Sequence, residues 1–450
     1  MTVTPETSRL PASIEYASLQ KGLSIAVAVL IAFAIIFPRS ATTIFLLPVV
    51  GGLAVLIFDP TKRGLRLPVN GLLISLVGFS LWSLLSAAWS AAPTASLSKP
   101  LFLLGGSIGV AVLAALGAQM RLSALKTLGY GVLAGLAIGA MLVCIETLTD
   151  QAITRFLMTN VAWLRQGYEK HLVMENGLVA HVGDGNINRR ATVVTMLLIP
   201  SALLLVALAE PTLKRAGLAA LVAVTAIFLA ASTHQSSQAA IIVSAIAWLL
   251  ALVSPLWARR LIALGWCVSC LLVVPLVIWL HTTGLHKDDN ALFYSARHRV
   301  VIWNATAEQI RKRPLLGIGA DATAVVTETQ TRQRQETGTA LHDGGFEVTS
   351  AHHAHNVFLQ VWYELGAVGA LLFMSLGLAA LAVIGRTRAQ VQPFLLAQFA
   401  SVAGILAFSF SIWQIWFQGA IGLGILTLLI SILAIERQQP DAILNDKQRV

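Results

Sequence analysis

Long apolar stretches alternate with short polar ones along most of the chain, a pattern that predicts a helical membrane protein. A helix needs about 20 mostly apolar residues to cross a bilayer. Twelve candidate spans meet or approach this length: 22–37, 41–58, 67–89, 100–118, 127–147, 192–209, 216–232, 239–257, 261–280, 356–384, 393–412 and 418–435. The predicted fold class is therefore an all-α polytopic membrane protein with about 12 transmembrane helices.

Composition narrows the class of protein further. Of the 450 residues, 56% are hydrophobic and only 12% are charged. A soluble domain carries about 25% charged residues, so a single large soluble globule is excluded, and the high apolar content also excludes intrinsic disorder. The three cysteines lie in apolar segments, and their spacing indicates no disulfide framework.

The surplus of positive charge follows the predicted loops. The net charge is +10, from 31 Lys and Arg against 21 Asp and Glu. Eleven of the positive residues lie in even-numbered short loops, and only Arg39 and Lys99 lie in odd-numbered ones. Since cytoplasmic loops are rich in Lys and Arg, both termini are predicted to be cytoplasmic. The two long loops are odd-numbered and therefore face the periplasm if the protein sits in a bacterial inner membrane.

These assignments divide the chain into seven predicted segments. They are a cytoplasmic N-terminus (1–21), helices 1–5 (22–147), a periplasmic loop (148–191), helices 6–9 (192–280), a large periplasmic loop (281–355), helices 10–12 (356–435) and a cytoplasmic tail (436–450). All ten histidines fall on the outer side, together with 13 of the 31 positive residues in the two long loops. The chemistry is therefore expected there.

The large loop is too long to be without structure. Residues 299–313 place Val300, Trp303, Ala307 and Ile310 at helical spacing, which predicts an amphipathic helix on the membrane surface or under a cap. Pro314 ends this helix, and a Gly-rich turn follows. The segment 327–350 is polar, and its fold stays open. The first loop has a candidate helix near 150–165.

Arginine and histidine side chains gather where the outer loops meet the membrane. Arginine binds phosphate oxygens with a planar, permanently charged fork, and histidine is the common general base at neutral pH. Together they predict group transfer from a phosphate-activated lipid. The residues are Arg189, Arg190, Arg297, Arg299, His352, His353 and His355.

Simpler interpretations of these residues stay open at this point. Interfacial arginines often only contact lipid head groups, and a histidine cluster in a loop is often solvated or binds metal adventitiously. The stretch from His286 to Asn290 offers cation ligands, but its groups are adjacent in sequence, so no metal and no cofactor are predicted. In the tenth span, Asn356, Gln360 and Glu364 recur every four residues and form a polar stripe that faces protein or water.

Three strings resemble the O-antigen ligase and polymerase superfamily. HNVFLQVWYELGAVG (355–369) is similar to its signature of a His, an Asn, Ser or Gln, nine residues, a Gly, two residues and a Gly. RVVIWNATAEQIRKRPLLGIGAD (299–321) resembles the segment upstream of that histidine, and NRRAT (188–192) its Asn-Arg entry into a span. Where the family often has a Ser-Arg pair after the seventh span, this chain reads HQSSQAA, with Gln238 at the expected arginine.

The resemblance, closest to the O-antigen ligases, implies a GT-C-like, metal-independent, inverting glycosyltransferase. Its donor would be an undecaprenyl-diphosphate-linked glycan and its acceptor lipid A–core oligosaccharide. His355 would be the general base, and Arg189 and Arg299 would bind the diphosphate, with Arg190 and Arg297 as adjacent candidates. His352, Asn356, Gln360 and Glu364 would support the site. Partners would be these two lipids and the surrounding membrane, with no nucleic acid.

Three alternatives remain. An O-antigen polymerase and a protein O-oligosaccharyltransferase share much of the motif. A secondary transporter would also have about twelve spans, but transporters have internal repeats and ionisable residues near the midplane. No repeat is evident in this sequence, and its charge is concentrated outside the predicted spans.

Overall fold

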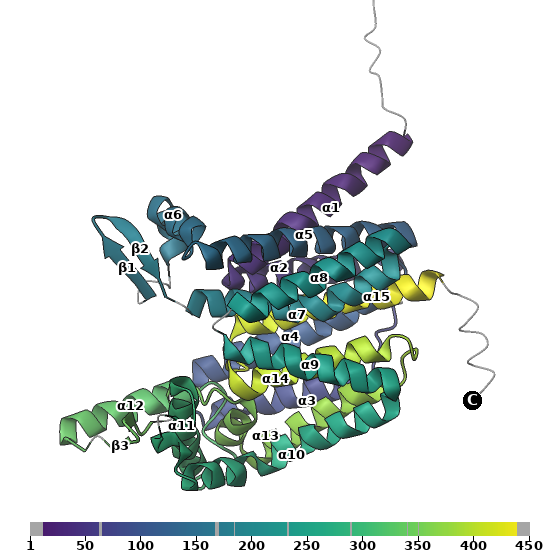
Figure 1. Cartoon of the computed structure of the whole chain (residues 1–450). Coiled ribbons are helices and arrows are strands. Elements are labelled where there is room, and N and C mark those ends of the chain that lie inside the picture. Colours follow the sequence, from purple (N-terminus) through teal and green to yellow (C-terminus); the bar gives the residue numbers. More distant parts are fainter. Residues whose placement is uncertain are drawn as a thin grey trace, which may run out of the picture.

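A computed structural model describes residues 12–62, 65–166, 171–183, 185–231, 234–288, 290–339, 341–349 and 351–438. Long helices run side by side in one bundle, and two groups of short elements project from one end of it (Figure 1). The all-α polytopic fold expected from the sequence is confirmed. Of the predicted terminal segments, residues 1–11 and 439–450 lie outside the described residues.

The bundle consists of helices that correspond to the apolar segments of the sequence. They are α1 (Ala12–Ile36), α2 (Ala41–Phe58), α3 (Gly71–Leu85), α4 (Pro93–Gly117), α5 (Leu122–Leu148), α7 (Gly185–Leu208), α8 (Pro211–Ala231), α9 (Gln235–Val253), α10 (Pro255–Thr282), α13 (Val357–Ile384), α14 (Gln392–Phe408) and α15 (Ile415–Gln438). Short 3₁₀ turns include η1 (Pro38–Ser40), η2 (Pro60–Lys62) and η3 (Ser86–Ala88).

The predicted count of twelve spans is not fully reached. Within the described ranges, ten helices are long and apolar enough to cross a membrane. The two outside this set are α8 and α14, of which α14 has only 17 residues because Ser409 leaves helical geometry. In the opposite direction, α7 begins at Gly185, so the predicted boundary of the first loop at residue 191 is too late. Arg189 and Arg190 therefore belong to a helix.

Close helix packing in the bundle depends on small residues, as is usual in membranes. Gly131, Gly135 and Gly139 line one side of α5 where it crosses α1. A Cβ at Gly135 would lie 2.6 Å from the carbonyl oxygen of Ala28, closer than real contacts allow. The spacing of these glycines by four residues thus lets two backbones touch.

The first outer loop folds into a small unit. It consists of α6 (Ala152–Asn160), the 3₁₀ turn η4 (Ala162–Arg165) and an antiparallel hairpin of β1 (Leu172–Glu175) and β2 (Leu178–Val182). The helix expected near 150–165 is confirmed, but the hairpin was not expected. Its signal is the pair Asn176-Gly177, which has positive φ at both residues, as a two-residue hairpin turn requires.

The second outer loop is also folded. It contains η6 (Leu285–Lys287), α11 (Tyr294–Ile310), α12 (Thr323–Thr337) and a short hairpin of β3 (His342–Asp343) and β4 (Phe346–Glu347). The helix predicted at 299–313 is therefore present, although it starts earlier and ends three residues sooner. It lies on protein rather than on lipid, because Val300, Ile302 and Trp303 are among its many buried residues.

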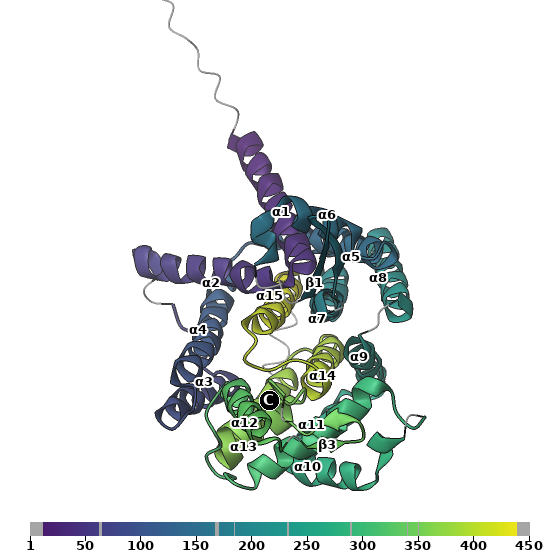
Figure 2. The ribbon, with the colours of Figure 1, turned by 90° about the vertical axis from the view of Figure 1, so that its left-hand side faces the viewer.

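Both outer loops leave the bundle at the same end, as the topology predicts. Figure 1 shows α6, β1 and β2 beside that end together with α11, α12 and β3, while α15 finishes at the opposite end. Viewed along the bundle in Figure 2, α11 and α12 lie in front of α13, and α6 lies in front of α5. Residues from both loops can therefore serve one surface.

Helix α13 is broken at Gly366, whose φ of 67° and ψ of −166° are open to glycine alone. Residues 314–322, here called the 314–322 loop, fill the break. Ile318 N donates to Tyr363 O at 3.1 Å, and Gly319 N donates to Glu364 O at 2.8 Å. Ala367 N in turn donates to Pro314 O at 2.9 Å. Irregular backbone at this depth is tolerated because protein satisfies its polar groups.

We expect Gly366→Ala to destabilise the folded protein strongly. The backbone strain alone costs about 1–3 kcal/mol, and a Cβ would lie 2.1 Å from the carbonyl oxygen of Leu315. The melting temperature in detergent, read as loss of a monodisperse gel-filtration peak, should fall by many degrees. Gly105→Ala is the matched control, since a Cβ there meets nothing within 4 Å. Equal melting temperatures for the two variants would contradict this account of the break.

Candidate functional site

His355 precedes α13 with a left-handed backbone, φ 51°. Its Nδ1 lies 3.1 Å from the carbonyl oxygen of Ser409. A carbonyl only accepts hydrogen bonds, so the neutral ring carries its proton on Nδ1, and Nε2 keeps a lone pair. The geometry therefore prepares His355 to accept a proton at Nε2.

The surroundings keep His355 neutral. Burial, followed by the positive charge of Arg299, lowers the pKa of His355 to about 4, although the Ser409 carbonyl acts in the opposite direction. Its neighbour His353, whose ring centroid is 4.1 Å away, has a pKa lowered to about 3 by burial and then by His355. Both rings are thus uncharged bases at neutral pH.

Arg299 is the cation at the centre of this group. It lies on α11 and is partly buried. Burial lowers the pKa of its guanidinium, but the ordinary value is 12.5, so Arg299 stays charged at neutral pH. Its charge contributes to the lowered pKa of His298, of His353 and of His355. A permanent cation surrounded by neutral histidines is a preformed site for an anion.

His234 is a member of the site that sequence reasoning missed. It is buried between α8 and α9, with Nδ1 2.8 Å from Ser237 Oγ and Nε2 3.2 Å from Ser409 Oγ. Burial and then Arg299 lower its pKa to about 4. Ser409 therefore connects His234 with His355. The HQSSQ string was noted only for the glutamine at Gln238, although its histidine was the available signal.

The two neighbouring arginines at the start of α7 have different surroundings. Arg190 is fully buried. Its Nη1 is 2.7 Å from Glu146 Oε2 on α5, and its Nε donates to Ile36 O at 2.9 Å. Thr154 on α6 also contacts the guanidinium of Arg190. This side chain therefore holds α5, α6 and α7 together. Arg189 is only partly buried at the same end of the bundle. Of the pair, Arg189 is the better candidate for a ligand, and Glu146 is a buried charge that sequence reasoning overlooked.

The second arginine pair divides in the same way. Arg297 donates from Nε to His286 O at 3.0 Å, and its guanidinium lies 5.4 Å from the ring centre of Phe346. It thus fastens α11 to η6 and to the β3–β4 hairpin, whereas the charge of Arg299 acts on His353 and His355. His352, the weaker histidine candidate, is exposed, so the structure does not place it in the buried group.

The polar stripe of the tenth predicted span faces protein. Asn356 caps α13 by accepting from Leu359 N at 3.0 Å. Gln360 Nε2 donates to Glu364 Oε1 at 3.1 Å and to Ser411 Oγ at 2.8 Å. Glu364 also accepts from Thr323 Oγ1 at 2.5 Å, from Asp321 N at 3.1 Å and from Trp413 Nε1. Through Asp321 N, Glu364 fixes the end of the 314–322 loop, and Gln360 joins α13 to Ser411.

An acidic side chain and a cavity also lie near the ends of the bundle. Asp321, in the 314–322 loop, has a pKa raised to about 6 by burial, against the charge of Lys99, and was not singled out from the sequence. A cavity of about 390 Å³ lined by Arg259, Arg260 and Arg386 lies where α10 starts and α13 ends. That is the opposite end of the bundle from His355, so the cavity is not part of this site.

One group of side chains has the composition of a metal site. His281, His286 and Asp343 bring their ligand atoms within 4.8 Å of one another. The sequence drew attention to the stretch starting at His286, but only that histidine takes part: Asp288 accepts from Asn290 N at 2.8 Å, and Asp289 lies outside the described residues. This group is distinct from the His355 site.

Comparisons with known proteins agree with the resemblance. Residues 218–374 match the family model described as O-antigen ligase. A protein of Rickettsia conorii named as a candidate polysaccharide ligase is 27% identical over 188 residues, which are 42% of this chain and 43% of that protein. Its counterpart from Rickettsia felis is 26% identical over 200 residues, 43% of this chain and 45% of the relative. The similarity thus spans less than half the length of these relatives.

Proposed function

We propose that this chain, which matches the O-antigen ligase family model over residues 218–374 and has ten helices long and apolar enough to cross a membrane in its described part, transfers O-antigen polysaccharide from undecaprenyl diphosphate to lipid A–core oligosaccharide. The membrane would be the bacterial inner membrane, with both termini in the cytoplasm and the His355 site facing the periplasm. The observation that carries the proposal is the pairing of a neutral, oriented histidine with a partly buried arginine in one group.

His355 is the general base in this mechanism. Its Nε2 takes the proton from an acceptor sugar hydroxyl while the hydroxyl oxygen attacks the anomeric carbon of the donor. The new C–O bond forms as the bond to the diphosphate breaks, and the bonding electron pair leaves with the diphosphate. A single displacement of this kind inverts the anomeric configuration. General base assistance contributes about 10²–10⁴-fold to the rate.

Arg299 and Arg189 hold the departing diphosphate. Negative charge develops on the bridging oxygen as the bond breaks, and a guanidinium fork already in place stabilises it without reorganisation. The histidines around Arg299 are neutral, so the positive charge of this group is carried by the guanidinium. These guanidinium groups supply the charge that a metal ion supplies in other diphosphate-using enzymes, so addition of Mg²⁺ or Mn²⁺ is not expected to change the rate.

The test of the function is transfer in vitro by the purified protein, from a lipid-diphosphate glycan to lipid A–core, followed on a gel as a shift of the acceptor. A strain lacking the protein provides the second readout. Accumulation of lipid-linked polymer that is never ligated supports the ligase, whereas accumulation of single lipid-linked repeats would make the protein a polymerase. Failure of transfer with active substrates and folded protein would overturn the proposal.

The pH profile tests the role of His355 separately. The base must be neutral, and its pKa of about 4 lies below the ordinary value of 6.5. We therefore expect kcat/KM, which reports ionisation of the free enzyme, to stay constant as pH falls from 8 to 5.5 and to decline only as pH approaches the lowered pKa. Arg299→Gln removes a cause of the shift, so the residual activity of that variant should decline at a higher pH. Identical acid limbs in both proteins would contradict the electrostatic coupling.

A further inference from the structure

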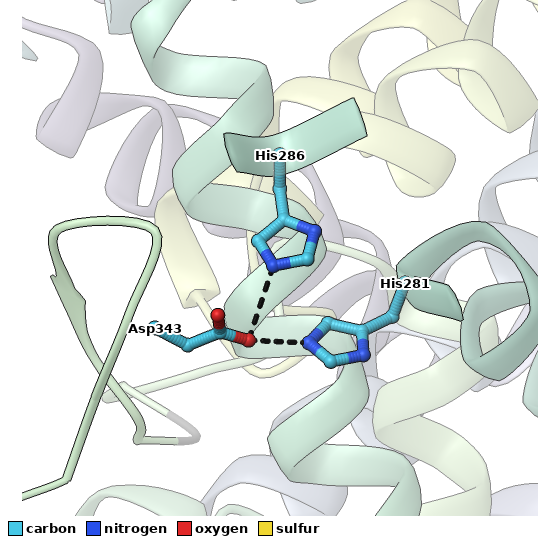
Figure 3. A group of neighbouring side chains, drawn as sticks. All are labelled: His281, His286 and Asp343. Atoms are coloured by element: carbon cyan, nitrogen blue, oxygen red, sulfur yellow. Dashed lines mark hydrogen bonds and ion pairs between the residues drawn. The ribbon is translucent and has the colours of Figure 1, made fainter. Parts of the chain in front are cut away.

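Three side chains from separate segments of the large outer loop meet at one point (Figure 3). His281 Nε2 lies 2.7 Å from Asp343 Oδ2, and His286 Nε2 lies 3.1 Å from the same oxygen. His281 belongs to the end of α10, His286 to η6 and Asp343 to β3. The two rings stack with centroids 4.4 Å apart. Two imidazole nitrogens thus converge on one carboxylate oxygen.

We propose that His281, His286 and Asp343 bind a zinc ion that fastens the large outer loop. Two histidine nitrogens and one carboxylate oxygen are a common zinc ligand set, with a water completing the tetrahedron. Ligand atoms of a tetrahedral site with bonds of about 2.0–2.2 Å stand about 3.3–3.6 Å apart. The separations of 2.7 and 3.1 Å therefore need to widen by less than about 1 Å, and all three ligand atoms already lie within 4.8 Å of one another, so side-chain rotation can complete the site.

The burial of His286 is a second, independent observation. Its side chain is 1% exposed, and within the described residues Nδ1 has no hydrogen-bond partner. A histidine buried only to hold the fold is expected to use both ring nitrogens. His286 uses the one that faces Asp343, as a metal ligand would.

Lys287 defines which oxygen is available. Its Nζ lies 3.2 Å from Asp343 Oδ1, so Oδ2 is left to the two histidines. Lys287 is 61% exposed and can swing into solvent, but its positive charge opposes a bound cation. A zinc site therefore predicts that removal of this lysine strengthens metal binding, whereas a simple ion-pair cluster would only lose a contact.

The ion would act on the position of α11. Arg297, two residues before Arg299, donates to His286 O at 3.0 Å and to Gly344 O at 3.4 Å. Both acceptors adjoin or belong to ligand residues, so a zinc ion that joins η6 to the β3–β4 hairpin also fixes the start of α11. The ion takes no part in bond making. The inference does not depend on the identity of the donor or the acceptor.

The experiment measures metal directly. Purified full-length protein in detergent is incubated with excess zinc, desalted and analysed by mass spectrometry for elements, and about one zinc per chain is expected. His286→Ala and Asp343→Asn should each lower retained zinc at least tenfold, and Lys287→Ala should bind zinc more tightly. His342→Ala is the matched control, because this exposed histidine adjoins Asp343 without facing the cluster, and it should retain zinc.

Cobalt replaces zinc in a second measurement that needs no variant. One equivalent of Co²⁺ bound by nitrogen and oxygen ligands at a four- or five-coordinate site gives visible ligand-field bands, which added zinc should abolish. Absence of these bands in folded wild-type protein would overturn the proposal, as would equal zinc in wild type and a folded His286→Ala. Neither measurement uses glycan transfer, so a wrong functional assignment would leave both results valid.

Discussion

Replacing His355 with alanine is expected to lower the rate of transfer by about 10²–10⁴-fold. The Ser409 carbonyl holds the proton of His355 on Nδ1 and so leaves a lone pair on Nε2. The alanine variant loses this base. The measurement is the initial rate of transfer by purified protein at saturating donor. Donor binding should persist, because Arg299 is unaffected, so the effect should appear in kcat rather than in KM.

A matched histidine variant separates chemistry from folding. His171 is exposed in the first outer loop, and His171→Ala should keep the wild-type rate. His355→Ala should insert into membranes and elute from gel filtration like wild type, since one side chain with a single hydrogen bond is lost. Wild-type transfer by folded His355→Ala would remove His355 from the mechanism.

Arg299→Lys should lower transfer by about 10²–10³-fold, the usual consequence of losing a group that stabilises charge in the transition state. Lysine keeps the positive charge but cannot form the planar fork that binds two phosphate oxygens at once. The conservative change is therefore expected to be nearly as damaging as Arg299→Gln. Comparison of the two variants in the same transfer assay measures how much the fork contributes beyond charge.

The control for this arginine lies at the end of the same helix. Arg311 caps α11 and is 69% exposed, and among the described residues its ion-pair partner is Glu308 at 3.6 Å. Arg311→Lys should transfer at the wild-type rate. If Arg299→Lys also retained full activity, Arg299 would be an interfacial anchor and not a ligand of the diphosphate.

The helices of the bundle were predictable because membrane spans are marked by local composition. Each apolar segment became a helix, as the exact agreement at α2 (Ala41–Phe58) shows. The boundaries that failed were at polar helix starts, since α7 begins seven residues before its predicted span. Polar residues there are held by tertiary contacts, such as that of Arg190 with Glu146, which no local pattern reveals.

The candidate site was predictable only in part for the same reason. Its charged residues could be found because they lie beside apolar spans, and the placement of both long loops at one end follows from topology. In each arginine pair, one member is held by the fold. Which member this is could not be foreseen, because it depends on partners such as Glu146 and His286 that are not adjacent in sequence. His234 was missed because its link to His355 runs through Ser409, which follows α14 and is distant from both histidines in sequence.

The break in α13 has a consequence for motion during turnover. The 314–322 loop that fills the break follows α11, and Trp303 on α11 donates to Ala354 O at 2.8 Å, next to His355. Arg299 and His355 are thus tied together twice, by the chain on one side and by this bond on the other. The proposed base and the proposed diphosphate ligand on α11 therefore belong to one connected part of the protein. In the proposed reaction, closing of the protein around donor and acceptor would therefore bring α7, with Arg189, towards this connected part of α11 and α13.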